Sequence, residues 1–209
     1  MPGVNPRCHF MASQDSKPAG APSVVAGSRS WVPIRSLSPR HRDRITAHLL
    51  DLPERDRYLR FGHAASDAQI CQYVQQLDFE RDELFGIFNR RLRMLAMAHV
   101  AYFQSDCQSP CAEFGVSVAA SARGRGYGRR LFDLAALHAR NRGVQTLLIH
   151  ALSENIAMLR IARHAGAEVV RDGSEAQALL ELPAETPGRA ERDAAQRIRS
   201  ASRPQSLNS

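Results

Sequence analysis

Glycines and arginines crowd one short stretch of this chain, Arg123-Gly124-Arg125-Gly126-Tyr127-Gly128-Arg129. An apolar stripe with helical spacing starts directly after it, at Leu131. The unpaired N–H groups at a helix start, and the positive end of the helix dipole, favour phosphate groups. Glycines let the backbone approach a bulky anion closely, and arginines add forked donors for its oxygens. The stretch therefore predicts a loop that binds a diphosphate.

Two widespread diphosphate motifs do not match this loop. A P-loop ends in Gly-Lys-Ser/Thr, whereas Gly128 is followed by two arginines. A dinucleotide fingerprint is spaced G-x-G-x-x-G and needs an acidic residue about 20 residues further on, whereas this loop is spaced G-x-G-x-G. A tight turn with solvated arginines and an RNA-binding Arg-Gly segment are the alternatives. The regular apolar stripe after the loop favours an ordered loop followed by a helix.

The elements that must position this loop alternate between strands and helices. Apolar spacing predicts strands at residues 31–37, 83–88, 92–103, 111–118, 144–152, 167–171 and 177–182. It predicts helices at 39–52, 66–79, 127–142 and 155–166, the last opened by Asn155. Hairpins at both ends of a βαβα centre indicate an α/β (α+β) fold, with a mixed sheet and helices on both faces. The loop then links the strand 111–118 to the helix 127–142.

Length and composition indicate a single globular domain with polar ends. The chain has 209 residues, 44% of them hydrophobic, and a formal net charge of +7. The excess positive charge favours acidic ligands in general without singling out nucleic acid. Residues 1–30 and the basic stretch 184–209 lack apolar periodicity, so we expect disordered tails around a folded domain at 31–183. Met11 is an alternative start for translation.

Patterns typical of membrane, secreted and metal-binding proteins are missing from the sequence. No apolar run of about 18 residues occurs, and the N-terminus lacks a charged head followed by an apolar core, so we predict a cytoplasmic protein. The four cysteines, Cys8, Cys71, Cys107 and Cys111, form no paired framework. Cys107 and Cys111 have no second Cys or His pair at zinc-finger distance, so we expect reduced thiols and no metal.

Two motifs together resemble the GNAT family of N-acetyltransferases, over about residues 32 to 182. The family's signature for the coenzyme A pyrophosphate, Gln/Arg-x-x-Gly-x-Gly/Ala, is matched by Arg123 to Gly128. Its second motif is a strand and an Asn-led helix that ends in Gly and an apolar residue, similar here to "LLIHALSENIAMLRIARHAGA". The resemblance implies the GNAT fold, a mixed, mostly antiparallel central sheet of about six to seven strands with about four flanking helices. It also implies that the fourth and fifth strands splay apart.

The same resemblance implies acetyl-CoA as the co-substrate and an amine as the acceptor, on a small molecule or a protein lysine. The pyrophosphate would lie on the loop Arg123–Arg129, and the pantetheine arm between the splayed strands, bonded to the backbone at Val116, Ser117 and Val118. Asn155 would lie near the thioester, and a plain helix cap is the alternative for it. In this family the amine attacks the thioester directly. We expect a monomer or homodimer, with no metal, membrane or specific nucleic acid as a partner.

An ammonium group must lose a proton before it can attack, so a base within reach is useful. Glu113 is the first candidate, because it lies on the strand face opposite Val116 and Val118. Members of the family that acetylate proteins have a glutamate in an "EFAV"-like string, which "EFGV" resembles here. An ion-paired surface glutamate is the alternative. His99 is the second candidate, although a strand histidine is more often a packing residue, and His150 is a weaker one.

The family's usual general acid is absent from this sequence. It is a tyrosine seven residues after the motif asparagine, where this chain has Ala162. Water would then protonate the leaving thiolate, or one of three residues that the sequence does not rank: Cys107, Cys111 and Tyr127.

The segment 52–62 resembles the "yyRF" segment of family members that acetylate lysines on metabolic enzymes. Four acidic and aromatic side chains in it would suit a cationic acceptor: Glu54, Asp56, Tyr58 and Phe61. A capped helix-turn with both aromatic rings in the core is the alternative.

Three functions are compatible with these features. The first is an acetyl-CoA-dependent N-acetyltransferase, which both motifs favour. The second is a non-catalytic acyl-CoA-binding sensor, which the missing tyrosine and the Arg-rich tails would suit. The third is a nucleic-acid binder, but aromatic residues make up only 6% of the chain and are not interleaved with the arginines. We therefore predict an N-acetyltransferase.

Overall fold

The computed structural model of the protein describes residues 32–105 and 108–183. The predicted disorder at 1–30 and 184–209, the alternative start at Met11, and Cys8 and Cys107 all lie outside the described residues. The strands are β1 (Ile34–Ser36), β2 (Glu83–Phe88), β3 (Met94–Gln104), β4 (Pro110–Val118), β5 (Thr146–Leu152), β6 (Glu168–Asp172) and β7 (Glu175–Glu181). The α-helices are α1 (Arg42–Leu50), α2 (Glu54–Phe61), α3 (Asp67–Gln76), α4 (Tyr127–Asn141) and α5 (Ile156–His164).

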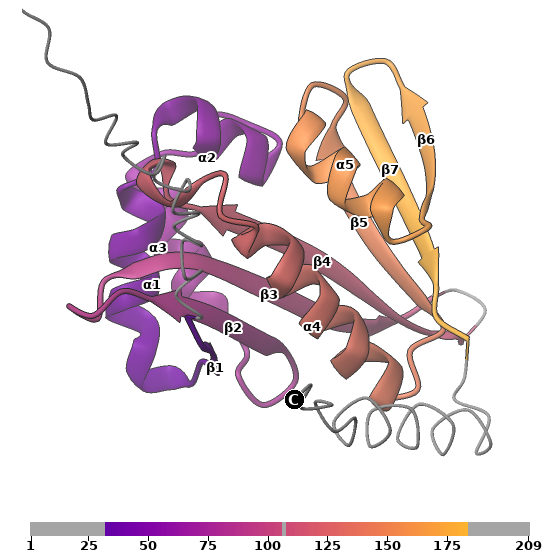
Figure 1. The fold of residues 1–209 in the computed structure, drawn as a ribbon, viewed down its shortest axis with the longest axis horizontal. Helices are drawn as coiled ribbons and strands as arrows, with labels where there is room; N and C mark the ends of the chain where they lie inside the picture. Colours follow the sequence, from indigo (N-terminus) through magenta and orange to yellow (C-terminus); the bar gives the residue numbers. More distant parts are fainter. Residues whose placement is uncertain (1–31, 106–107, 184–209) are drawn as a thin grey trace, which may run out of the picture. The chain divides into compact units, whose positions relative to one another are not determined.

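The strands form a seven-stranded sheet in the order β1-β2-β3-β4-β5-β7-β6 (Figure 1). Neighbouring strands are antiparallel except for β4 and β5, which run parallel. The predicted mixed, mostly antiparallel sheet with flanking helices is therefore confirmed. Helix α2 was not among the four predicted helices; for the segment 52–62 the sequence indicated a helix-turn only as an alternative. None of its residues is fully buried, so α2 carries no apolar stripe that periodicity could detect.

The sheet splays apart between β4 and β5. The two strands pair only at Cys111 with Thr146, Ala112 with Leu147, and Glu113 with Leu148. β4 continues to pair with β3 as far as Val118, whereas β5 continues to pair with β7. Beyond Glu113, the backbone N–H and C=O groups of β4 that face β5 therefore have no strand partner and can bond to a ligand.

Two hydrophobic cores lie on the two faces of the sheet. Helices α4 and α5 pack on one face, where the Phe114 and Phe132 rings meet edge to face with centroids 5.0 Å apart. Helices α1 and α3 cover the other face, where Ile70 is fully buried. Alternation along β2 supplies both cores, because Phe85 points to the first and Leu84 to the second.

Candidate functional site

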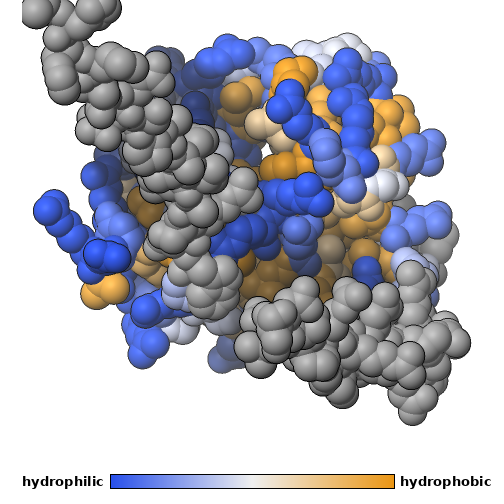
Figure 2. Space-filling model, viewed as in Figure 1, coloured by the Kyte–Doolittle hydropathy of each residue, from blue (hydrophilic) through white to orange (hydrophobic). Residues whose placement is uncertain are grey.

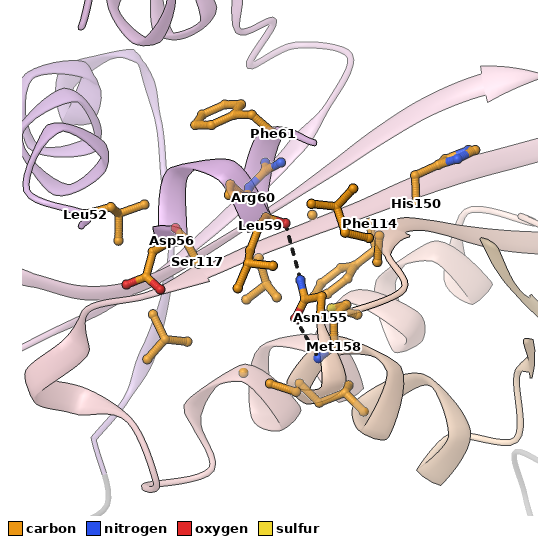
Figure 3. A pocket seen from close by; sticks show the side chains of 18 of the residues that line it. Leu52, Asp56, Leu59, Arg60, Phe61, Phe114, Ser117, His150, Asn155 and Met158 are labelled. Carbon is orange, nitrogen blue, oxygen red and sulfur yellow. Dashed lines mark hydrogen bonds between the residues drawn. The ribbon is translucent and has the colours of Figure 1, made fainter. Parts of the chain in front are cut away.

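A pocket of about 730 Å³ lies where β4 and β5 separate. Its lining comes from α2, β4, the loop before α4, β5 and α5. Figure 3 shows Leu59 of α2 opposite Asn155 and Met158 at the start of α5. In Figure 2, hydrophobic residues are visible in a hollow between hydrophilic ones, near the place where Figure 1 draws α2 beside α5. A pocket of this size can hold most of a cofactor-sized ligand.

The glycine loop forms one end of this pocket. Gly124 and Gly126 have φ angles of 73° and 74°, the left-handed region that favours glycine. Gly126 is also the N-cap residue of α4, and no side chain caps this helix, so the N–H groups of its first turn stay available. A Cβ on Gly128 would lie 3.1 Å from the Ile161 side chain of α5, so a side chain at this position would crowd α5.

Most of the predicted cofactor-binding residues line the pocket. They are Val116, Ser117, Val118, Arg123, Gly124, Gly126, Tyr127, Gly128, Arg129 and Asn155. Arg125 is not part of the lining, and its Nη2 donates to the Ser121 carbonyl at 3.4 Å. The loop is tied to α2 by an ion pair between Arg123 and Asp56. Because the Arg123 side chain is half exposed, this pair adds little stability and a phosphate group could compete for the arginine.

Ser117 connects the pocket to helix α1. Its Oγ lies 2.9 Å from Nε2 of His48, and both residues are buried. Burial, which penalises the charged ring, lowers the pKa of His48 to about 4, so the imidazole is neutral at pH 7. This contact was not predicted, because nothing local in the sequence relates two residues so far apart.

Glu113 reaches the pocket from β4 with a free carboxylate. It is exposed, lines the pocket, and forms no hydrogen bond or ion pair with any described residue. The sequence left open that Glu113 is a surface glutamate held in an ion pair. Among the described residues, the structure shows no such ion pair for Glu113. A free carboxylate at a pocket wall can accept a proton directly or through one water.

The second predicted base, His99, does not line the pocket. Its Nε2 lies 2.8 Å from Asp82 Oδ2, and its Nδ1 lies 2.8 Å from the Tyr73 hydroxyl. Both ring nitrogens are therefore engaged, so the geometry does not support contact between His99 and an acceptor amine. The Tyr73 hydroxyl in turn contacts Arg60, a pocket residue that sequence reasoning did not single out. In the sequence, Arg60 lies between two apolar residues, Leu59 and Phe61, and this position could have indicated that its side chain is partly buried.

Asn155 serves as a helix cap and as a link between helices. Its Oδ1 accepts a hydrogen bond from the Met158 N–H at 3.2 Å, which caps α5. Its Nδ2 donates to the Leu59 carbonyl of α2 at 3.3 Å (Figure 3). The structure thus shows Asn155 as the N-cap of α5, which was the alternative role for this residue. The same side chain also links α2 to the start of α5.

The remaining predicted residues divide between the pocket and the rest of the domain. Asp56, Phe61 and the weaker candidate His150 line the pocket, whereas Glu54 and Tyr58 do not. Ala162 is fully buried, so no hydroxyl is available at the usual position of the general acid. Of its three alternatives, Tyr127 lines the pocket, Cys111 is a buried free thiol outside its lining, and Cys107 lies outside the described residues.

The described part of the chain brings no three His, Cys, Asp or Glu side chains together as ligands for a metal ion. Across residues 32–105 and 108–183, no helix combines the length and apolar character that a membrane span requires.

Known proteins show the same combination of sequence and fold. Residues 32–168 match the family model described as an acetyltransferase (GNAT) domain. The structure is similar to the GNAT domain of S. lividans PAT, with a TM-score of 0.60 and 18% identity over 71% of this chain and 89% of that one. It is also similar to a ribosomal-protein-alanine N-acetyltransferase from Brucella melitensis, with a TM-score of 0.58 and 19% identity over 72% of this chain and all (100%) of that one.

A third similar structure is that of yncA from Salmonella typhimurium, determined with its cofactor acetyl-CoA. Its TM-score is 0.55, with 15% identity over 74% of this chain and 96% of that one. At these identities the structural likeness speaks for the fold alone, and the sequence match to the family model carries the relationship.

Proposed function

This chain belongs to the GNAT acetyltransferase family, and we propose on that premise that it transfers an acetyl group from acetyl-CoA to a primary amine. One observation carries the proposal. β4 loses its β5 partner after Glu113, and the glycine loop closes the same gap at the start of α4. The acceptor is a small amine or a protein lysine. The predicted cytoplasmic location and monomeric or dimeric state stay predictions.

Acetyl-CoA fits the residues that line this gap. The unpaired backbone of β4 at Val116 and Val118 offers N–H and C=O groups to the amide-rich pantetheine arm. The uncapped first turn of α4, with Arg123 and Arg129 beside it, offers N–H donors and positive charge to the diphosphate. The left-handed Gly126 leaves this approach free of a side chain.

The bound co-substrate would supply an activated acyl thioester, and the residues of the chain would handle protons and positions. Glu113 is proposed as the base, because its free carboxylate lies in the pocket wall and can accept the proton that the ammonium group must lose. Ser117, held by His48, would fix the β4 backbone beside it. With Ala162 in place of a tyrosine, the proton for the leaving sulfur would come from water or from Tyr127.

Calorimetric titration with acetyl-CoA tests the cofactor site. Gly126→Asp places a carboxylate against the diphosphate and should weaken binding at least tenfold, or about 1.4 kcal/mol. Gly143→Asp is the matched control, because Gly143 also has a positive φ, 77°, but follows the C-terminal end of α4, outside the pocket lining. Equal affinities for the two folded variants would contradict the proposed site.

A non-catalytic acyl-CoA sensor is the alternative, and the buried Ala162 at the usual acid position favours it. An acceptor screen that detects released CoA separates the two functions. Polyamines, amino acids, aminoglycosides and lysine peptides cover the main classes of amine. Tight binding of acetyl-CoA with no CoA released by any acceptor would favour the sensor.

A further inference from the structure

Arg60, near the C-terminal end of α2, brings an unpaired positive charge to the pocket. It lines the pocket, and its guanidinium forms no ion pair with a carboxylate of the described residues. Its buried Nε has no hydrogen-bond partner among those residues either. Buried charges in proteins are normally paired with an opposite charge. A half-buried guanidinium that has no carboxylate partner among the described residues, and whose buried Nε is unbonded, therefore points to an anionic group on the ligand.

A chain of hydrogen bonds holds Arg60 from behind, and donor chemistry fixes its direction. Arginine only donates, so the Tyr73 hydroxyl accepts from Arg60 Nη2 at 3.1 Å. The Asp82 carboxylate only accepts, so the single N–H proton of the neutral His99 ring lies on Nε2, which donates to Asp82 Oδ2 at 2.8 Å. His99 Nδ1 therefore accepts from the Tyr73 hydroxyl at 2.8 Å. Burial lowers the pKa of His99 and raises the pKa of Tyr73, so both side chains are neutral. The groups that touch Arg60 thus orient it without cancelling its charge.

Strand β4 leaves room for this guanidinium. A Cβ on Gly115 would lie 2.6 Å from Arg60 Nη2 and 2.7 Å from its Cζ, so any larger residue would push the arginine away. The Phe61 and Tyr73 rings flank the group, with centroids 5.3 and 5.7 Å from Cζ. The cation is therefore packed in one position on the inner surface of the pocket, where Figure 3 shows it beside Phe61.

The charges at this end of the pocket do not suit a purely cationic acceptor. Asp56, one of the acidic residues expected to hold such an acceptor, is paired with Arg123, and Glu54 does not line the pocket. The lining carboxylate next to Arg60 along β4 is that of Glu113, which lies two residues before Gly115 on the same face of the strand, with the two Cα atoms about 7 Å apart. A negative group at Glu113 and a positive group packed beside Gly115, two residues along the same strand, match a ligand that carries an amine and a carboxylate.

We propose that Arg60 binds a carboxylate of the acceptor, so that the acceptor is a small amino acid whose amine and carboxylate are only a few bonds apart. The amine would lie toward Glu113 and the carboxylate toward Arg60. Arg60 is then a specificity-determining residue, and Tyr73, His99 and Asp82 position it. This inference rests on the proposed acetyl transfer.

The test compares matched acceptors that differ only in the carboxylate. Initial rates of CoA release are measured with amino acids, with their amides and with the corresponding decarboxylated amines, and acetyl-CoA affinity is measured in parallel. The wild type should prefer the amino acids at least tenfold in kcat/KM. Arg60→Gln should bring this ratio close to one while acetyl-CoA affinity is kept. Arg55→Gln, an exposed arginine of the same helix paired with Glu154, is the control and should keep the preference.

A second variant separates a specific effect from poor folding. Gly115→Ala leaves the charge in the protein but displaces the guanidinium, so it should lower the ratio as Arg60→Gln does. If the wild type has the same kcat/KM for the amides and decarboxylated amines as for the amino acids, the inference is overturned and acetyl transfer stays intact. The same holds if turnover is confined to polyamines or lysine peptides. If the protein binds acetyl-CoA but turns over no acceptor, the inference about Arg60 is overturned and the non-catalytic acyl-CoA sensor is favoured. Absence of acetyl-CoA binding would remove the inference and the proposed function together.

Discussion

His48 makes the stability of this domain depend on pH. The residue lies in α1, is only 5% exposed, and contacts Ser117 of the pocket wall at 2.9 Å. Its pKa is lowered from 6.5 to about 4, chiefly because burial penalises the charged ring. A contact with the Met94 backbone and the charge of Asp51 act in the opposite direction, and Arg93 adds to the lowering.

Between pH 6.5 and 4 the unfolded chain binds a proton at His48 that the folded domain does not, so acidification favours unfolding. The stabilising contribution is fully present above the unfolded pKa of 6.5 and is lost as the pH falls toward the folded pKa of about 4. The full difference corresponds to about 3 kcal/mol. Of this, about 2 kcal/mol is already lost at pH 5.

Urea unfolding at pH 7.5 and pH 5 measures this loss in the wild type and in His48→Gln. Glutamine keeps a hydrogen-bonding group near Ser117 but does not titrate, so its pH-dependent loss should be smaller by about 2 kcal/mol. Other histidines with a lowered pKa, such as His99, contribute to both proteins and cancel in the difference. The exposed His63→Gln is the control and should behave as the wild type. An equal loss in the wild type and His48→Gln would refute the assignment of a buried neutral imidazole.

Three further predictions concern the base, a helix cap and the domain boundaries. Glu113→Gln should lower kcat by roughly 10² to 10⁴ with acetyl-CoA affinity unchanged, and near-normal turnover would argue for deprotonation by solvent. Asn155→Ala should lower the free energy of unfolding by about 1–2 kcal/mol, measured by urea titration, because α5 loses its cap and α2 a hydrogen bond. A chain of residues 31–183 should bind acetyl-CoA in calorimetry as the full chain does, and unfolding on removal of either tail would show that the boundary is misplaced.

Elements with strong local signals were predicted closely. The strand at 83–88 has the predicted bounds, because a continuous apolar run ends at a short polar turn. Helix α4 was found from its apolar stripe, which packs against the sheet. Helix α2 lacks such a stripe, since Arg57 and Arg60 occupy half-buried positions, where Arg57 donates to the Leu52 carbonyl and Arg60 to the Tyr73 hydroxyl of α3. Its position over the pocket is thus set by tertiary contacts that periodicity does not report.

The same distinction separates the two ends of the pocket. The glycine loop is contiguous, so residue types and spacing alone indicated its place, and the structure adds the left-handed φ angles of Gly124 and Gly126. His99 was singled out as a base because of its residue type, but a side chain's hydrogen-bond partners decide what it can do. Here Asp82 and Tyr73 engage both nitrogens, and neither partner is close to His99 in the sequence.

The acceptor end depends on a register that no single segment encodes. His99 reaches Asp82 because Leu84 of β2 pairs with His99 of β3, and a shift of one residue would turn the histidine to the opposite face. Tyr73 reaches the same point only because α3 covers that face of the sheet. Family motifs therefore report the cofactor, which binds to contiguous backbone, and leave the acceptor undetermined. Substitutions that disturb the cross-element contacts of Arg60 should accordingly change acceptor preference more than acetyl-CoA affinity.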